Sequence, residues 1–128
     1  MDHHDDIDLV LDLAAAWTAP LSEAQLREAM EPPAGDDETL KTQLRRLRQR
    51  AMAHIALRDL CGLAPLAEVV ESMTLLADFT TNLALDHHHR QLATTYGEPL
   101  DRSGQAQRLL IIGMGKLGGR ELNVSSDV

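Results

Sequence analysis

The strongest constraint on the fold is a pair of long amphipathic stretches separated by only a few residues. Residues 36–61 carry one continuous apolar stripe at helical spacing, formed by Leu40, Leu44, Leu47, Ala51, His54 and Ile55. Residues 65–95 repeat the pattern with Leu66, Val69, Val70, Met73, Leu76, Ala77, Thr80, Ala84 and His87. Gly62 suits the position just after a helix, and Pro65 suits a first turn. Two helices joined this closely are predicted to pack as an antiparallel hairpin.

Two shorter helices are predicted ahead of the hairpin. In residues 5–17 apolar side chains recur at helical spacing, and acids in the first turn suit the helix dipole. A proline ends that helix, and Ser22 can cap a second one whose apolar face holds Leu26, Ala29 and Met30. Prolines and a glycine make residues 32–35 a linker. Either Asp36 or Asp37 is predicted to cap the third helix.

The composition excludes several classes of protein. Only Trp17, Phe79 and Tyr96 are aromatic, so the core must come from aliphatic side chains, which suits packed helices. No run of 18 apolar residues is present, so we expect no membrane span, and the first residues do not resemble a signal peptide. Cys61, the one cysteine, excludes an internal disulfide, fits a reducing cytoplasm and is expected to serve packing.

Charge is distributed unevenly along the chain. The net charge of −8 argues against a general affinity for nucleic acid. Residues 1–38 hold eleven of the twenty acidic residues and one base, whereas residues 39–58 hold six bases and no acid. We predict that the basic block is a solvated helix face paired with the acidic segment. The alternative is that it docks a phosphate or an acidic partner.

The histidines at residues 3–4 and 87–89 raise the question of a metal site. Adjacent residues on a helix lie about 100° apart, so three consecutive histidines are not expected to share one ordinary site. A partly exposed helix flank is the prediction, and a Zn²⁺ site is the alternative. His54 is predicted to be hydrogen-bonded at the edge of the core. Arg58 and Asp59 are interpreted as a structural pair, and a partner-binding surface is the alternative.

The pattern changes after the hairpin. Residues 97–107 are polar and rich in turn formers, which predicts a loop. Residues 108–112 are mainly apolar and end at a glycine, which predicts a buried strand. A glycine cluster follows, with Gly113, Gly115 and Gly118 at the spacing of a dinucleotide-binding turn. Glycines after a strand are typical of several kinds of phosphate site, which differ in what comes next.

Two of these kinds do not fit the residues that follow. A dinucleotide fold needs a full crossover helix and a second strand, but Asn123 and the serines after it favour a turn after one or two turns of helix. A P-loop needs a lysine directly after the last glycine of its motif, where this chain has Gly119. The dinucleotide spacing is therefore interpreted as a coincidence.

A nucleotidyltransferase site of the polymerase-β type fits better. Its pattern is an apolar residue and two glycines at a helix start, then two carboxylates two residues apart on a strand. Glycine N–H groups can approach triphosphate oxygens because no Cβ intervenes, and the carboxylates can hold Mg²⁺. Leu117, Gly118 and Gly119 supply the first half of this pattern. Ser126 and Asp127 begin the second half.

The stretch from residue 113 to residue 128 closely resembles the active-site segment of the glutamine synthetase adenylyltransferase family, whose members add and remove adenylyl groups. The resemblance extends upstream to the basic helix and covers about residues 36–128. Asn-Val-Ser-Ser-Asp at residues 123–127 is similar to the adenylyl-removing half of that family. The implied fold class is mainly α, in which about four helices lead into the first strand of an incomplete polymerase-β-type nucleotidyltransferase domain of the α+β class.

The resemblance also implies a reaction and its participants. The implied reaction is phosphorolysis of adenylyl-tyrosine on glutamine synthetase with Mg²⁺, under control of the PII signal protein. ATP or ADP, the AMP moiety and phosphate are the implied substrates. Asp127 is the implied catalytic and metal-binding residue, and the implied phosphate- and nucleotide-binding residues are Lys116, Gly118, Gly119 and Ser126. A purely structural role is the alternative for Lys116. Arg120 could also neutralise phosphate charge, but it is expected to lie at the surface.

These interpretations divide the chain into short helices with a linker (1–35), a helical hairpin (36–96), a loop (97–107) and the start of a nucleotidyltransferase domain (108–128). Family members are several times longer, and the second carboxylate of the motif is missing from these 128 residues. We therefore expect the chain to be partial and inactive by itself. The leading hypothesis is a segment of a cytoplasmic enzyme. The alternative is a non-catalytic helical module that docks glutamine synthetase or PII.

Overall fold

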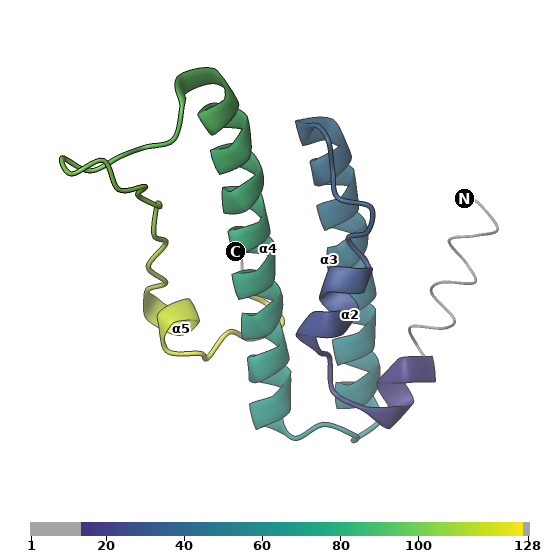
Figure 1. Ribbon diagram of the computed structural model, residues 1–128. Coiled ribbons are helices and arrows are strands. Elements are labelled where there is room, and N and C mark those ends of the chain that lie inside the picture. Colours follow the sequence, from purple (N-terminus) through teal and green to yellow (C-terminus); the bar gives the residue numbers. More distant parts are fainter. Residues whose placement is uncertain (1–13, 127–128) are drawn as a thin grey trace.

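The structure, a computed structural model, describes residues 14–126 and is dominated by a hairpin of two long helices. Helix α3 (Asp37–Leu60) and helix α4 (Leu66–Tyr96) run antiparallel and lie side by side, as predicted (Figure 1). The short helix α2 (Glu23–Glu28) packs on the hairpin. After α4 the chain turns back along the side of α4 that faces away from α3 and forms helix α5 (Gly115–Gly118).

The start of α3 is determined by a local cap. The side chain of Asp36 accepts hydrogen bonds from the backbone N–H of Thr39 (2.8 Å) and from the Thr39 hydroxyl (3.0 Å). These bonds lower the pKa of the Asp36 carboxyl below its ordinary value. Of the two candidate caps, the structure therefore selects Asp36, which leaves the side chain of Asp37 to turn toward α4.

A Schellman turn closes the hairpin. Gly62 has a left-handed backbone (φ +67°), and its N–H donates to the Asp59 carbonyl (3.0 Å). The N–H of Leu63 donates to the Arg58 carbonyl (2.8 Å). Pro65 is the N-cap of α4, so this helix begins one residue later than predicted. The predicted role of Gly62 as the residue that ends the first long helix is confirmed.

The core lies between α2, α3 and α4 and consists of aliphatic side chains and methionines. Its buried members in the described chain are Leu21, Leu26, Met30, Leu40, Leu47, Ala51, Ile55, Val69, Met73, Leu76, Ala77 and Leu122. The apolar stripes predicted for the hairpin are thus confirmed, except that Leu66 is exposed at the start of α4. Trp17 and Tyr96 are exposed, while Phe79 packs against the core. No helix among the described residues is long and apolar enough to cross a membrane.

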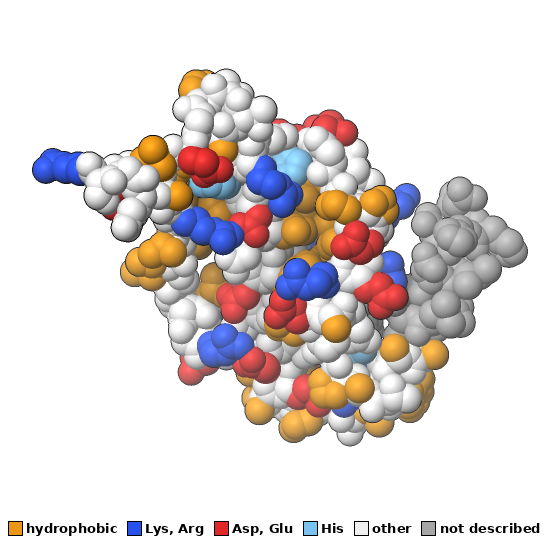
Figure 2. Space-filling view, viewed as in Figure 1, with side chains coloured by type: hydrophobic (Ala, Val, Ile, Leu, Met, Phe, Trp, Pro, Cys, Tyr) orange, Lys and Arg blue, Asp and Glu red, His pale blue; other side chains and the backbone are white. Residues whose placement is uncertain are grey.

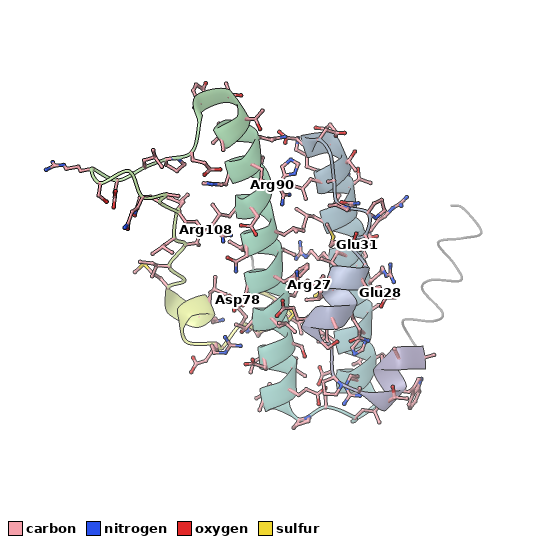
Figure 3. The ribbon with its side chains drawn as sticks, viewed as in Figure 1. Arg27, Glu28, Glu31, Asp78, Arg90 and Arg108 are labelled. Atoms are coloured by element: carbon pink, nitrogen blue, oxygen red, sulfur yellow. The ribbon has the colours of Figure 1, made fainter. Side chains whose placement is uncertain are left out.

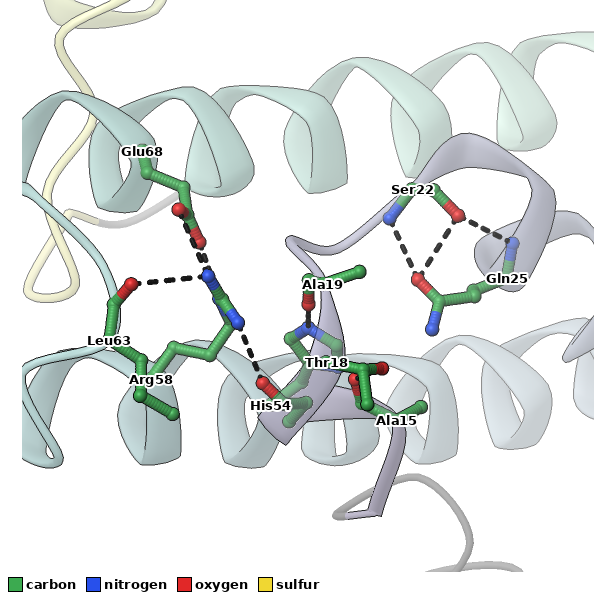
Figure 4. Close-up of polar contacts among 10 residues, drawn as sticks. Ala15, Thr18, Ala19, Ser22, Gln25, His54, Arg58, Leu63 and Glu68 are labelled. Atoms are coloured by element: carbon green, nitrogen blue, oxygen red, sulfur yellow. Dashed lines mark hydrogen bonds and ion pairs between the residues drawn. The ribbon is translucent and has the colours of Figure 1, made fainter.

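Helix α2 has a cap of its own. Ser22 and Gln25 form a capping box, in which the Ser22 hydroxyl accepts from the Gln25 N–H (3.3 Å) and the Gln25 side chain accepts from the Ser22 N–H (2.9 Å) (Figure 4). Leu26 and Met30 face the core, as predicted. Residues 14–18 are also helical, which agrees with the first predicted helix; its earlier residues lie outside the described part of the chain.

Arg58 joins four parts of the chain at the closed end of the hairpin (Figure 4). Its guanidinium donates to both carboxylate oxygens of Glu68 on α4, at 2.5 and 3.2 Å. It also donates to the carbonyls of Ala16 (2.8 Å) and Leu63 (3.2 Å). Only 7% of Arg58 is exposed, and the hydrogen bond to Glu68 raises the pKa of Arg58 above its ordinary value. The structural role predicted for Arg58 is confirmed, but its partner is Glu68 rather than the exposed Asp59.

Two other single-residue predictions have opposite outcomes. His54 is buried and its Nε2 lies 3.1 Å from the Ala19 carbonyl, which confirms a hydrogen-bonded histidine at the edge of the core (Figure 4). Cys61 was expected to serve packing, and this is wrong because its side chain is exposed. The physical reason is its position as the C-cap of α3, where the chain leaves the core to make the turn.

The buried strand predicted at residues 108–112 is also wrong. Within the described chain this segment forms no strand, and the four apolar residues 109–112 are between 50% and 83% exposed. A strand needs a hydrogen-bonding neighbour along its edge, and no described segment supplies one here. The loop predicted before it is confirmed; its one β contact is an isolated bridge between Leu100 and Ala106.

Replacing Arg58 is expected to destabilise the hairpin more than replacing Lys41. Arg58→Met keeps an aliphatic stem but removes the donor that Glu68 and two backbone carbonyls share, so we expect Tm to fall by several degrees in thermal unfolding followed by circular dichroism. Lys41→Met is the matched control, because the Lys41–Glu38 pair is exposed and contributes little. Glu68→Met added to Arg58→Met should restore part of the loss. Equal Tm values for Arg58→Met and Lys41→Met would contradict this account.

Candidate nucleotide and phosphate site

The glycine cluster forms a compact turn around α5. Gly115 begins this helix with a left-handed backbone (φ +58°), which favours glycine. The N–H groups of Gly118 and Gly119 donate to the carbonyls of Met114 (3.2 Å) and Gly115 (2.9 Å), respectively. In this structure both N–H groups are therefore used within the turn, and their role in binding phosphate stays a prediction.

Close backbone packing explains why position 118 requires glycine. A Cβ on Gly118 would lie 2.4 Å from the Gly113 carbonyl oxygen, a backbone atom that cannot rotate away. A Cβ on Gly113 would lie 3.1 Å from the Leu117 side chain, and one on Gly119 would lie 3.3 Å from the Gly115 carbonyl oxygen. Of these glycines, Gly118 and Gly119 were predicted to bind phosphate. The steric requirement depends on how tightly the turn folds on itself and has no signal in the sequence.

Hydrogen bonds among short polar side chains shape the turn that leads to residue 127. The Ser126 hydroxyl donates to the Asn123 side-chain oxygen (2.7 Å) and accepts from the Asn123 N–H (3.2 Å). The Ser125 hydroxyl donates to the same side-chain oxygen (3.1 Å). Lys116 is exposed on α5. Asp127, the predicted catalytic and metal-binding residue, lies outside the described residues.

The end of the glycine turn is docked on α4 by ion pairs and one buried leucine. Arg120 pairs with Glu71, with its Nε donating over 3.1 Å, and its Nη1 lies 3.5 Å from a carboxylate oxygen of Asp78. Leu122 is buried and belongs to the core. Arg120 lies at the surface, as predicted, but it also links the glycine turn to the hairpin.

The extended segment before the glycine turn is attached to α4 as well. Arg108 forms an ion pair with Asp86, and Figure 3 shows Arg108 reaching toward α4 while Asp78 lies on the side of α4 that faces this segment. Arginine–carboxylate pairs therefore attach the chain to α4 before and after the glycine turn. Between the two arginines lie the exposed Lys116 and five exposed apolar side chains: Leu109, Leu110, Ile111, Ile112 and Met114.

A cavity of about 210 Å³ lies where the C-terminal segment meets the hairpin. It is lined by Leu44, Arg48, Met73, Leu76, Ala77, Thr80 and Ser126. Arg48, Thr80 and Ser126 are the lining residues with polar side chains, and the other four are apolar. Ser126 therefore lies next to α3 and α4. It directly precedes Asp127, the predicted metal ligand.

Charges of both signs are interspersed over the face of the molecule around α4, and hydrophobic side chains gather near the closed end of the hairpin (Figure 2). The basic block predicted on α3 has mixed partners. Lys41 pairs with Glu38 (2.7 Å), inside the acidic segment, whereas Arg58 pairs with Glu68 on α4. The predicted pairing between the basic block and the acidic segment is therefore confirmed for Lys41 and wrong for Arg58.

A second group of metal-ligand side chains lies apart from the glycine turn. Asp37 on α3 and His87 and His88 on α4 each bring one donor atom to within 4.8 Å of the others. The partly exposed flank predicted for these histidines is wrong for His87, which is buried and whose Nε2 lies 3.0 Å from Oδ1 of Asp37 on the facing helix. No sequence pattern signals this group, because it depends on the register between two helices.

Comparison with known proteins identifies the class of protein to which this chain belongs. A family model described as glutamate-ammonia ligase adenylyltransferase matches residues 5–128, which places the chain among the adenylyltransferases. Curated relatives named bifunctional glutamine synthetase adenylyltransferase/adenylyl-removing enzyme agree. They include proteins from Aromatoleum aromaticum (43% identical over 120 residues), Thioalkalivibrio sulfidiphilus (45% over 123) and Nitrosomonas europaea (49% over 96).

The three alignments cover 94%, 95% and 73% of this chain. The chain spans only 13%, 13% and 10% of the length of those relatives. No solved structure matches. The chain belongs to the glutamate-ammonia ligase adenylyltransferase family, glutamate-ammonia ligase being another name for glutamine synthetase. The family resemblance noted in the sequence is thereby confirmed.

Gly118→Ala is expected to open the glycine turn. The added methyl group would overlap the Gly113 carbonyl oxygen, and we expect a local cost of about 1–3 kcal/mol, as for other overpacked sites. Faster amide exchange across residues 113–121 would report this opening. Gly35→Ala is the matched control, since a Cβ at Gly35 meets nothing within 4 Å. Unchanged exchange in Gly118→Ala would show that the turn does not need its close backbone approach.

The Arg120–Glu71 pair should make docking of the glycine turn sensitive to acid. The hydrogen bond from Arg120 lowers the pKa of Glu71 below its ordinary value of 4.5. A carboxylate with a lowered pKa in the folded state contributes stability above its ordinary pKa and loses that contribution as the pH falls through the lowered value. We therefore expect exchange protection of residues 113–122 to be constant near neutral pH and to fall below pH 4.5.

Two variants separate this pair from general acid effects. Glu71→Gln should weaken protection of the segment already at neutral pH and should reduce the further loss in acid. Glu121→Gln removes a negative charge from the same segment without touching the pair, so its acid response should match that of the unmodified chain. An unaltered acid response in Glu71→Gln would mean that other contacts hold the segment.

Proposed function

We propose that this chain supplies the helical support and the first phosphate-binding turn of the adenylyl-removing site of a bifunctional glutamine synthetase adenylyltransferase/adenylyl-removing enzyme. The observation that carries the proposal is the family match over residues 5–128, which includes the glycine turn and Asp127. Because the chain spans 13% of the length of the relatives named above, the proposal concerns the part of the site that these residues supply.

The proposed reaction is a phosphorolysis of adenylyl-tyrosine. An oxygen of inorganic phosphate attacks the phosphorus of the adenylyl group, the bond from that phosphorus to the tyrosine oxygen breaks, and ADP forms. The released tyrosine oxygen takes up a proton. Because both phosphate groups are anionic, catalysis requires cations positioned around them. Lys116, exposed on the glycine turn, is the side chain that we assign to this role.

Asp127 is proposed to bind Mg²⁺, since carboxylate oxygens are the ligands that this ion prefers. When bound, the ion would neutralise charge on the phosphate oxygens. The hydrogen bonds of Ser125 and Ser126 to Asn123 support the assignment, because they define the turn directly before the carboxylate. Contact of Ser126 with the hairpin cavity adds a rigid base, which a precise metal ligand needs.

Glutamine synthetase is the proposed protein substrate, since the relatives carry it in their names. PII is proposed as the regulator, and the cytoplasm as the location, from the family resemblance. The hairpin would act as the scaffold that positions the glycine turn. The hairpin helices α3 and α4 take no chemical part, and the pairs of Arg108 and Arg120 with α4 hold the glycine turn beside them.

A second candidate function is a helical docking module for glutamine synthetase or PII. The observation that favours it is a set of exposed large apolar residues toward the closed end of the hairpin: Trp17, Leu60 and Leu66. Such a surface would bind a partner without any chemistry at Asp127. The catalytic function therefore requires Asp127, whereas the docking function requires the apolar surface.

The test is a chimera in which these 128 residues replace the aligned segment of the Aromatoleum aromaticum relative. We expect the chimera to release ADP from adenylylated glutamine synthetase in the presence of phosphate. Asp127→Asn should lower that rate by about 100-fold or more, because it removes a charged ligand while keeping the size of the side chain. Asp59→Asn, the same change at an exposed position on α3, is the control and should leave the rate unchanged.

The readouts distinguish the two candidates. Full phosphorolysis by Asp127→Asn would refute the catalytic assignment and leave docking as the role of the chain. Loss of glutamine synthetase binding in Leu60→Ser combined with Leu66→Ser, with Asp127→Asn binding normally, would locate docking at the closed end of the hairpin.

A further inference from the structure

The open end of the hairpin brings together three side chains that commonly bind metal ions. Asp37, the first residue of α3, has its Oδ1 atom 3.0 Å from Nε2 of His87 and 3.9 Å from Nδ1 of His88. His87 is only 4% exposed, whereas about half of the Asp37 and His88 side chains is exposed. The group therefore has one buried ligand that is held in place and two that can adjust toward an ion.

Neighbouring histidines can share this site because they present different nitrogen atoms. His87 offers its distal Nε2 and His88 its proximal Nδ1, while the two rings stand edge to face with centroids 5.3 Å apart and an angle of 87°. Adjacent helical residues are rotated by about 100°, which argued against a shared site. A distal nitrogen from one ring and a proximal nitrogen from the next can nevertheless reach the same point. His89 does not take part, since its Nε2 lies 3.0 Å from Glu98 instead.

The carboxylate of Asp37 is already oriented by the helix opposite. Gln91 on α4 donates to its Oδ1 over 2.9 Å. An outer hydrogen bond of this kind is what holds a ligating carboxylate in proteins that bind metals.

We propose that Asp37, His87 and His88 bind a divalent transition-metal ion, for which Zn²⁺ is the representative. Two imidazole nitrogens and one carboxylate oxygen suit Zn²⁺ and its neighbours, whereas Mg²⁺ and Ca²⁺ prefer oxygen ligands throughout. Three protein ligands leave one position of a tetrahedral ion for water. Ion binding needs the donor atoms to close to about 2.0–2.2 Å from the metal, which the exposed Asp37 and His88 can do by rotation.

Binding also requires a change of tautomer at His87. Because an ionised carboxylate can only accept, the hydrogen bond to Asp37 requires the His87 proton on Nε2, the position that the ion would take. The neutral imidazole then carries its proton on Nδ1, so no net charge is lost from the ring. The bound ion would join the first turn of α3 to the C-terminal half of α4, at the end of the hairpin opposite Arg58.

The test is titration of the full 128-residue chain with Zn²⁺ by calorimetry and with Co²⁺ by visible absorption. His3 and His4 are first replaced by alanine in every sample, so that they cannot supply ligands. We expect one ion per chain and a higher Tm with Zn²⁺. Asp37→Asn and His88→Ala should each weaken binding by about tenfold or more and should abolish the rise in Tm. Asp37→Asn leaves the Asp36 cap in place, so the helix should still form.

His89→Ala is the matched control, since it removes an adjacent imidazole that faces Glu98 rather than Asp37. It should bind Zn²⁺ with unchanged affinity and retain the Co²⁺ absorption bands of a site with nitrogen and oxygen ligands. The proposal is overturned if the chain shows no saturable binding of one ion. It is also overturned if His89→Ala weakens binding as much as His88→Ala does.

Discussion

The guanidinium of Arg58 is the group on which the closed end of the hairpin depends. A charge taken out of water is tolerated only when it is paired and its hydrogen-bonding groups are satisfied. Arg58 meets this condition with Glu68 on α4 and with two carbonyls, one before α2 and one in the α3–α4 turn. Satisfying one cation therefore positions three segments relative to α3. Aliphatic packing is less directional, so this polar cluster gives the core a definite arrangement.

Helix α4 divides the molecule into a strongly packed part and a more weakly attached one. Its side toward α2 and α3 contributes buried aliphatic residues, whose contacts do not change with pH. Its side toward the C-terminal segment contributes carboxylates that pair with Arg108 and Arg120, and exposed ion pairs of this kind are individually weak. Leu122 is the main apolar anchor of that segment. The glycine turn can thus be displaced at a lower free-energy cost than the hairpin can be opened.

The helices were predictable because their signals are local. Periodicity located α3 and α4, and the Gly62 turn and the Ser22 cap could be read from single residues and their near neighbours. The strand at residues 108–112 was not predictable in the same way, since a strand requires partners that these described residues lack. At the candidate site the sequence identified the glycines and the family, but it assigned Gly118 to phosphate alone. The clash that a Cβ would make with Gly113 appears only in three dimensions.

The order of residues was enough to predict the helical class, the limits of the two long helices to within a residue or so, and the motif by which the family is recognised. Tertiary structure alone decided that Arg58 pairs with Glu68, that Arg120 reaches Glu71 and that His87 meets Asp37. These pairs are separated by 10, 49 and 50 positions. Their formation depends on the tightness of the turns and on the register between packed helices. Side-chain spacing along the chain encodes a helix face, but it does not encode which residue of the next element will lie opposite.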